Sequence, residues 1–185
     1  MTSPKRGVSL PCAVASFLIT TLIAPTVATL TSSATAAPAP KPRPAVIEGV
    51  VTRVFDGDSL LLQPALPALS LQVRLMHIDA PEICQNWGAQ SRAALAALLL
   101  DKPVSVHTVA RDRYGRVVGR VTVDGVDASV AQVEAGHAWS ARTKWDQGPL
   151  VKQERMAKAL ARGLHSELRP QMPKAFRASN GPCPH

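Results

Sequence analysis

The nine residues Arg74-Leu-Met-His-Ile-Asp-Ala-Pro-Glu82 join an apolar, strand-like run to one arginine and two carboxylates. Pro81 cannot continue a strand inside a sheet, fixes its own φ and restricts the residue before it to extended geometry. Asp79 and Glu82 therefore flank a stiff bend, and Arg74 lies on the strand that leads into it. The stretch predicts that one cation and two acids are held in a small volume at the end of a strand.

Two further β-rich runs precede this stretch. Val46 to Phe55 and Ser59 to Gln63 are separated by Asp56-Gly57-Asp58, which is a turn signal. A short segment that contains two prolines then leads into the third run, Leu71 to Ile78. Three strands joined by short turns predict an antiparallel meander that curls or closes on itself.

The hydrophobic period changes after Pro81. Leu95, Leu98 and Leu99 share one helical face, so a helix is expected over 89–100. The remaining expected elements are two strands over 104–109 and 116–123, a short helix that Asp127 caps and Gly136 ends, and a helix over 149–163 with Met156, Leu160 and Leu164 on one stripe. This order predicts an α+β fold of the OB type, a five-stranded β-barrel with three α-helices. Other small α+β folds share parts of the order, so the motifs below decide.

The chain divides into four expected segments. They are a signal peptide (1–36), a proline-rich linker (37–45), the OB-fold domain (46–168) and an irregular C-terminal tail (169–185) that contains four prolines. A basic start at Lys5 and Arg6, an apolar run over 13–24 and the cleavage pattern Ala34-Thr35-Ala36 indicate secretion. We therefore expect a secreted or periplasmic protein with no stable membrane association after cleavage. An uncleaved membrane anchor is the alternative, because the low-charge run is long.

The charge balance favours a polyanionic partner. The chain carries a formal charge of +8 at pH 7 with a pI near 10.0. Loss of residues 1–36 would remove two cations and no acid, which leaves +6. Such an excess suits nucleic acid or an anionic membrane surface, although many exported proteins are simply basic.

Cleavage would also leave two cysteines, Cys84 and Cys183. In an oxidising compartment an even pair favours one disulfide, which would tie the tail to the loop just after Glu82. Two free thiols are the alternative.

Taken singly, the charged residues at strand ends have ordinary explanations. Asp58 and Asp79 are hard oxygen ligands of the kind that Ca²⁺ or Mg²⁺ requires, but aspartate is also common in turns. Arg74, inside an apolar run, needs an anionic partner, and that partner is either a phosphate or a carboxylate such as Glu82. Their order along the chain is more informative.

Three motifs in this order resemble the staphylococcal nuclease-like (thermonuclease) family. They are Val54-Phe55-Asp56-Gly57-Asp58-Ser59, the stretch from Arg74 to Glu82, and Asp112-Arg-Tyr-Gly-Arg116, and the resemblance extends over about 46–163. The resemblance implies a five-stranded OB barrel and a Ca²⁺-dependent phosphodiesterase that acts on DNA and RNA and leaves 3′-phosphates. We expect a monomer that acts on single-stranded or locally melted substrate.

The resemblance also assigns roles to individual residues. Asp58 and Asp79 match the metal-binding carboxylates, and Ala80 stands where the family usually has a threonine whose carbonyl joins the metal shell. Glu82 matches the general base, and Arg74 and Arg116 match the arginines that grip the scissile phosphate.

The chain departs from the family after Gly136, where nucleotide-facing tyrosines are usual. Tyr114, Trp145 or Trp139 could stack on a base instead, and Arg113 could touch a terminal phosphate. Two alternatives to a nuclease are a catalytically silent OB-fold module that binds nucleic acid and an anchored module that binds protein. Degenerate members of the fold lose the acids or arginines, so the joint presence of Arg74, Glu82 and Arg116 favours the enzyme.

Overall fold

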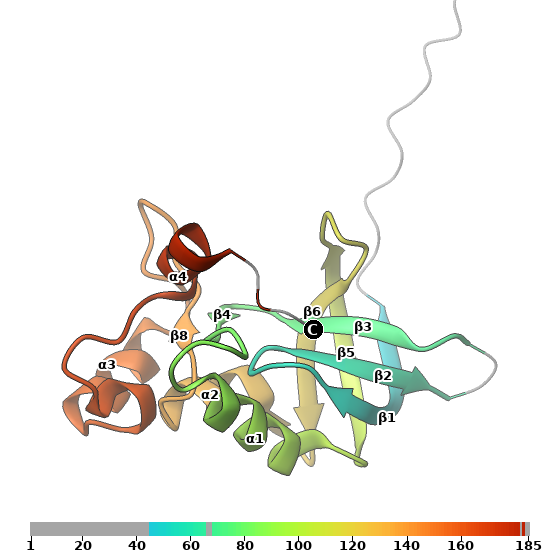
Figure 1. Ribbon diagram of the computed structural model, residues 1–185. Coiled ribbons are helices and arrows are strands. Elements are labelled where there is room, and N and C mark those ends of the chain that lie inside the picture. Colours follow the sequence, from blue (N-terminus) through green and yellow to red (C-terminus); the bar gives the residue numbers. More distant parts are fainter. Residues whose placement is uncertain (1–44, 66–67, 182, 184–185) are drawn as a thin grey trace, which may run out of the picture. The chain divides into compact units, whose positions relative to one another are not determined.

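The computed structural model describes residues 45–65, 68–181 and 183. The expected signal peptide, and the linker except for residue 45, lie outside the described residues. Five strands in the described part form a closed barrel (Figure 1): β1 (Val46–Val54), β2 (Ser59–Pro64), β3 (Leu71–Leu75), β5 (Pro103–Arg111) and β6 (Val117–Val123). Neighbouring strands follow the order β3-β2-β1-β5-β6, and a parallel pairing of β3 with β6 closes the ring. The predicted five-stranded OB barrel is confirmed.

The remaining elements lie between β3 and β5 in the chain or follow β6. The short strands are β4 (Ile78–Asp79), β7 (Val126–Asp127) and β8 (Trp139–Ser140). The helices are α1 (Gly88–Leu99), α2 (Ala128–Glu134), α3 (Val151–Ala159), the 3-10 turn η1 (Gly163–Ser166) and α4 (Pro173–Asn180). In the described residues no helix is long and apolar enough to cross a membrane.

The core lies inside the barrel and under α1. Leu60, Leu62 and Val121 from the strands are fully buried, and so are Leu95 and Leu99 of α1. Alternation along β3 buries Val73 and Leu75, so Arg74 between them points away from the core with its side chain 26% exposed. The alternation that turns Val73 and Leu75 toward the core therefore turns Arg74 toward the surface.

The third expected strand is shorter than the sequence indicated. It was expected to run to Ile78, but His77 has a positive φ of 68° and ends β3 in a turn. The chain then forms β4, in which Ile78 pairs with Ser140 and Asp79 with Trp139 of β8. A non-glycine residue in the left-handed region cannot continue a strand, so Asp79 leaves the barrel sheet and joins a separate two-stranded ladder.

The apolar stripe expected on the helix over 149–163 is wrong except at Leu164, which is 1% exposed and lies in η1. Met156 and Leu160 are 58% and 54% exposed, whereas the buried face of α3 carries Glu154 and Ala157. The carboxylate of Glu154 accepts the backbone N–H of Ser140 at 3.0 Å and pairs with two cations, Arg142 and Lys158. Apolar spacing alone cannot predict that this face is buried, because the buried position is an acid whose charge is paired in the folded protein.

The tail is not wholly irregular. Residues Pro173–Asn180 form α4, so the described part has four α-helices where three were expected. Pro173 occupies the first turn of α4, where its missing N–H is not needed and its fixed φ suits a helix. Pro173 therefore marks the start of a helix and does not exclude one from the tail.

Candidate active site

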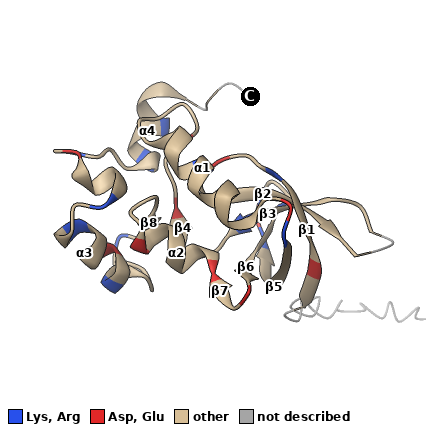
Figure 2. Cartoon of the chain, turned by 90° about the horizontal axis from the view of Figure 1, so that it is seen from below, with Lys and Arg blue, Asp and Glu red and all other residues tan. Residues whose placement is uncertain are grey.

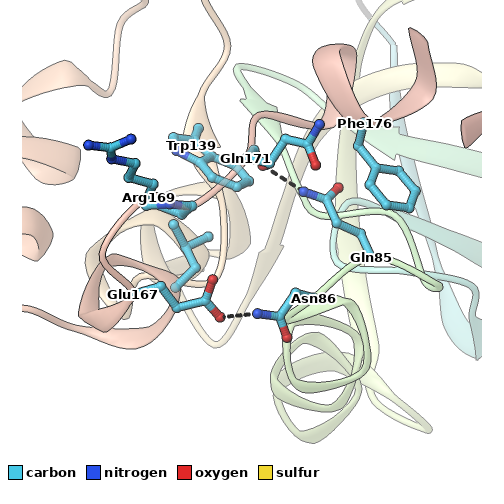
Figure 3. Close-up of a pocket in the computed structure, with 9 residues that line it drawn as sticks. Gln85, Asn86, Trp139, Glu167, Arg169, Gln171 and Phe176 are labelled. Carbon is cyan, nitrogen blue, oxygen red and sulfur yellow. Dashed lines mark hydrogen bonds between the residues drawn. The ribbon is translucent and has the colours of Figure 1, made fainter. Parts of the chain in front are cut away.

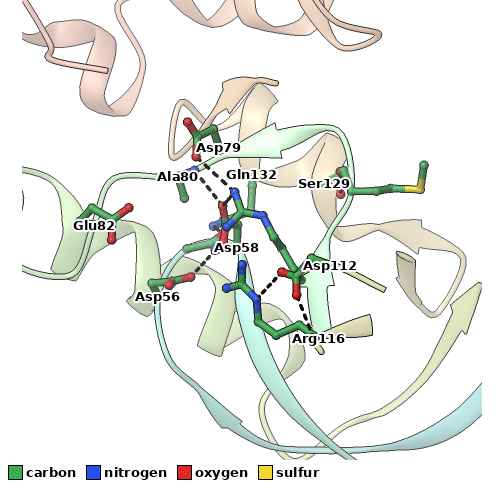
Figure 4. Close-up of polar contacts among 12 residues, drawn as sticks. Asp56, Asp58, Asp79, Ala80, Glu82, Asp112, Arg116, Ser129 and Gln132 are labelled. Carbon is green, nitrogen blue, oxygen red and sulfur yellow. Dashed lines mark hydrogen bonds and ion pairs between the residues drawn. The ribbon is translucent and has the colours of Figure 1, made fainter. Parts of the chain in front are cut away.

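The stretch from Arg74 to Asp79 meets Asp58 at the rim of the barrel. The register of β2 and β3 pairs Ser59 with Arg74, which brings the preceding Asp58 beside the guanidinium. One terminal nitrogen of Arg74 lies 2.9 Å from Asp58 Oδ2 and 3.2 Å from Asp79 Oδ1. The backbone N–H of Ala80 donates to Asp58 Oδ2 at 3.2 Å. Figure 4 shows Asp58, Asp79 and Ala80 gathered in this way.

The turn that carries Asp58 is fixed from two sides. Asp56 accepts the N–H of Asp58 at 2.9 Å, and the buried Gln132 of α2 donates to the carbonyl of Gly57 at 2.9 Å. A Cβ at Gly57 would lie 1.7 Å from Ser91 Oγ, so this position needs glycine for close approach to α1. The Asp58 carboxylate is consequently held in place before any ligand arrives.

Charge in this cluster is unbalanced toward the acids. Burial raises the pKa of Asp58 well above its ordinary value, and the carboxylates of Asp56 and Asp79 act in the same direction against the charge of Arg74. Burial alone would lower the pKa of Arg74, but the charges of Asp58, Asp79 and Asp56 offset it and raise that pKa. Three acids lie close to Arg74, and Arg177 approaches one of them, Asp79, at 3.8 Å. The three negative charges exceed the two positive ones, which favours a further cation.

A tight turn between β5 and β6 holds Arg116. Asp112 Oδ1 accepts the backbone N–H groups of Tyr114 and Arg116 at 2.9 and 3.0 Å, and its Oδ2 accepts Arg116 Nε at 2.7 Å. Partial burial opposes ionisation of Asp112, but these hydrogen bonds outweigh it and hold the pKa of Asp112 below its ordinary value. Among the described residues, the two terminal nitrogens of Arg116 have no protein hydrogen bond. They are available to an anion.

Glu82 lies on the loop between β4 and α1, and Figure 4 shows it to one side of the aspartates. Its N–H donates to Gln85 Oε1 at 3.2 Å, and its carbonyl accepts the N–H of Gln85 at 2.8 Å. A Cβ at Gly88 would lie 2.0 Å from the Glu82 carbonyl oxygen, so α1 packs directly on this loop. The Glu82 carboxylate forms an ion pair with Arg177 of α4. This cation was not foreseen.

A pocket of about 430 Å³ is lined by Arg74, by Arg116 and by residues of the C-terminal segment. Its charged lining consists of two acids and five cations, Asp79, Asp112, Arg74, Arg116, Arg142, Lys174 and Arg177. We call it the basic pocket. Basic residues on α4 are visible in Figure 2. The excess of positive charge around two fixed acids suits a phosphate ester.

The aromatic residues predicted to contact substrate differ in exposure and in their distance from the arginines. Tyr114 is 69% exposed, with the guanidinium carbons of Arg113 and Arg116 at 4.8 and 5.4 Å from its ring centre. Tyr114 and Arg116 also line a neighbouring hollow of about 540 Å³. Trp145 is 87% exposed with Lys144 over its ring, and it is not among the described residues that line the basic pocket. Trp139 is buried at 3% exposure, so it is a core residue.

The predicted metal ligands Asp58 and Asp79 do not form a ready-made metal cluster. Within the described residues there is no group of three or more His, Cys, Asp or Glu side chains able to hold a metal ion. Nevertheless one oxygen of Asp58 and one of Asp79 converge on a single cationic nitrogen of Arg74. Two hard, convergent oxygens in an acid-rich site fit a divalent ion such as Ca²⁺ or Mg²⁺.

The C-terminal segment is tied to the Glu82 loop. Cys84 and Cys183 form a disulfide, with their Cα atoms 5.7 Å apart. Gln85 Nε2 donates to the Gln171 carbonyl at 2.6 Å, and Asn86 donates to Glu167 Oε1 at 2.6 Å (Figure 3). Sequence reasoning missed Arg177 and Lys174, although the cysteine next to Glu82 was a signal that the tail lies close to it.

The barrel and the basic pocket together define a class of protein, an OB-fold domain with a site suited to phosphodiesters. The chain matches the family model described as Staphylococcal nuclease homologue over residues 72–167. It is 36% identical over 134 residues to an "Uncharacterized endonuclease" of Escherichia coli, which covers 72% of this chain and 86% of that protein. The chain therefore belongs to the staphylococcal nuclease homologue family.

Plant relatives agree over a shorter part of their length. The "Probable staphylococcal-like nuclease CAN1" of Oryza sativa subsp. japonica is 37% identical over 111 residues, which is 60% of this chain and 33% of the rice protein. The resemblance inferred from three motifs is confirmed, and family membership supports a nuclease.

Proposed function

We propose that the protein is an exported, Ca²⁺-dependent nuclease that hydrolyses phosphodiester bonds of single-stranded or locally melted DNA and RNA and releases 3′-phosphates. The observation that carries the proposal is the basic pocket, in which Arg74 and Arg116 lie beside Asp79. Membership of the staphylococcal nuclease homologue family supports the same chemistry.

Neutralising the phosphate is the first requirement, because an anionic diester repels nucleophiles. The terminal nitrogens of Arg116 are available, and Asp112 fixes the direction of its fork. Arg74 can transfer part of its contact from the aspartates to a phosphate oxygen. Both guanidiniums would bind more tightly as negative charge develops in the transition state, which lowers the barrier.

Asp58, Asp79 and the carbonyl of Ala80 would hold the metal ion. When bound, Ca²⁺ supplies Lewis-acid polarisation of a phosphoryl oxygen and a site for water. The raised pKa of Asp58 supports this assignment, because a second cation would offset the repulsion among the buried acids. Arg74 would then be released toward substrate.

Glu82 acts as the general base. Its carboxylate takes a proton from the attacking water, the water oxygen bonds to phosphorus, and the bond from phosphorus to O5′ breaks. The departing O5′ takes up a proton from solvent. The loop that holds Glu82 is anchored through Gln85 and Gly88, so the carboxylate is carried on a fixed backbone.

Substrate bases would stack on Tyr114. Its exposed ring lies beside Arg116, so a base on the ring and its phosphate on the guanidinium are compatible. Arg113, which donates to the Tyr114 hydroxyl at 2.7 Å, adds positive charge for a neighbouring or terminal phosphate. We keep Trp145 as a weaker candidate for contact with more distant nucleotides.

Kinetics of three variants test the proposal. Purified protein with Ca²⁺ should cleave a single-stranded oligonucleotide, and end analysis should find 3′-phosphates. Glu82→Gln and Arg116→Ala should each lower kcat by about 100-fold or more, as removal of a base or a charged donor does. Arg155→Ala is the control, because among the described residues this exposed arginine of α3 donates a side-chain hydrogen bond only to Gln147, at 3.1 Å, and does not line the pocket. Full activity of either site variant would contradict the mechanism.

A further inference from the structure

The C-terminal segment brings a cation to the residue proposed as the base. Arg177 of α4 forms an ion pair with Glu82 Oε1 and lies 3.8 Å from Asp79 Oδ1. Its side chain is 40% exposed, and it lines the basic pocket. No other cation is paired with Glu82 among the described residues. Arg177 is therefore the side chain that sets the direction of this carboxylate.

Two ties hold α4 in this position. The disulfide joins Cys84, two residues after Glu82, to Cys183 beyond the end of α4. The buried side chain of Gln85 bridges both parts, because it accepts the N–H of Glu82 and donates to the carbonyl of Gln171 just before α4. Figure 3 shows the second of these contacts. The loop that carries the base and the helix that carries Arg177 are thus fastened to each other on both sides of their ion pair.

Resting on the proposed role of Glu82, we propose that Arg177 is a positioning residue for the general base. By holding Oε1, Arg177 leaves Oε2 of Glu82 directed toward water, and it keeps the carboxylate from turning away into solvent. The C-terminal segment is then a wall of the active site, and the disulfide fastens that wall to the loop of the base.

A purely structural role for the ion pair would give a different result. An exposed pair of this kind contributes little to folding, so Arg177→Ala should keep the native fold. Misplacing a reacting group by about 1 Å can cost roughly 100-fold in rate. The loss should therefore appear in kcat, with thermal unfolding nearly unchanged. Arg177→Lys, which restores one positive charge, should recover a large part of the rate.

The decisive experiment is a double-mutant cycle between Arg177 and Glu82. Single-turnover rates on an oligonucleotide are measured with excess enzyme for wild type, Arg177→Ala, Glu82→Gln and the double variant, so that slow residual cleavage is detected. Arg177→Ala should lower the wild-type rate by about 10- to 100-fold. In the Glu82→Gln background the same change should alter the rate by less than about 2-fold, because Arg177 acts through Glu82. Arg155→Ala serves as the control.

The outcomes separate the two proposals. Equal losses in both backgrounds, or a wild-type rate for Arg177→Ala, would overturn the positioning role while the nuclease remains. An inactive wild-type protein would overturn the proposed function and this role with it. If Arg177→Ala does not fold, the pair Cys84→Ser and Cys183→Ser frees the wall without touching a charge. Its rate should fall in the wild-type background and stay level in the Glu82→Gln background, and the reverse pattern would overturn the proposal.

Discussion

At the scale of single residues, the Asp58 carboxylate is 4% exposed in its side chain and lies among other acids. Burial raises its pKa well above the ordinary value, which means that the charged form is disfavoured in the folded, metal-free protein. The same buried charge suits a divalent ion. We therefore expect the Asp58 carboxylate to lower the stability of the metal-free protein and to favour binding of a metal ion.

We expect Asp58→Asn to raise the melting temperature of the apo protein by a few degrees at pH 7. A raised folded-state pKa means that this group's contribution is fully present below the ordinary pKa of aspartate and is lost as pH rises through the folded value. The difference between variant and wild type should therefore vanish at low pH. Thermal unfolding with a chelator measures it, and Asp124→Asn in an exposed turn is the control.

The same variant should lose stabilisation by Ca²⁺. Wild-type melting temperature should rise with Ca²⁺ concentration, because a ligand that binds only the folded state stabilises it by mass action. Asp58→Asn should show no such rise over the same range. A variant that responds like wild type would remove Asp58 from the metal shell.

At the scale of elements, α3 is held to β8 by a buried acid. Glu154 is 1% exposed and meets Arg142, Lys158 and the N–H of Ser140. Burial would raise the pKa of Glu154, but these partners outweigh it and lower the pKa below its ordinary value. Because Arg142 also lines the basic pocket, this cluster connects α3 to the site.

Removing that acid should be costly. Glu154→Ala leaves two cations and a buried N–H without their partner, and we expect a loss of about 3 kcal/mol in the free energy of unfolding. Since the pKa of Glu154 is lowered, its contribution is present above the ordinary carboxyl pKa and is lost as pH falls through the folded value. Urea titrations at pH 7 and at acidic pH measure both effects. Exposed Glu134→Ala should leave stability unchanged within error.

The disulfide closes a long loop, because Cys84 and Cys183 are 99 positions apart in the sequence. Replacing both cysteines by serine should lower the free energy of unfolding by about 2–4 kcal/mol, because the unfolded chain gains freedom. Urea titration measures the loss, and peptide mapping without reduction identifies the bond. Separate thiol peptides for both cysteines in protein kept from reductants would contradict the bond.

Much of the fold could be predicted from sequence because its signals are local. Alternation and turn residues predicted the barrel strands, and the helical period after Pro81 predicted α1. The motifs predicted that Asp58 lies near Arg74 and that Arg74 and Arg116 share a site. Asp127 caps α2 as expected, accepting two backbone N–H groups. The misses depend on distant partners. His77 turns the chain out of β3, Glu154 is buried with Lys158 of its own helix and Arg142 of another segment, and Arg177 reaches Glu82 only through the folded tail.

At the scale of the whole molecule, we expect the positive charge to dominate the binding of the proposed substrate. Arg116, Lys174 and Arg177 surround the basic pocket on a chain with a formal charge of +8. Substrate binding should therefore weaken as the salt concentration rises, because the release of counterions from the nucleic acid becomes less favourable. The expected slope of log affinity against log salt is about −0.7 for each phosphate neutralised on a single strand.

Lys174→Ala should make that slope shallower by up to about 0.7 while leaving kcat nearly unchanged, since Lys174 lines the pocket but pairs with no described acid. KM measured from low to physiological salt gives the slope. Lys152→Ala on the exposed part of α3 is the control. An unchanged slope for Lys174→Ala would exclude this residue from phosphate binding.

The most direct test of the central claim is digestion of a single-stranded oligonucleotide by the purified protein with Ca²⁺, repeated after a chelator is added. We expect cleavage that stops with the chelator, resumes with excess Ca²⁺ and is lost by about 100-fold or more in Glu82→Gln. Protein that leaves the oligonucleotide intact with Ca²⁺, or that cleaves it equally well as Glu82→Gln, would contradict the account.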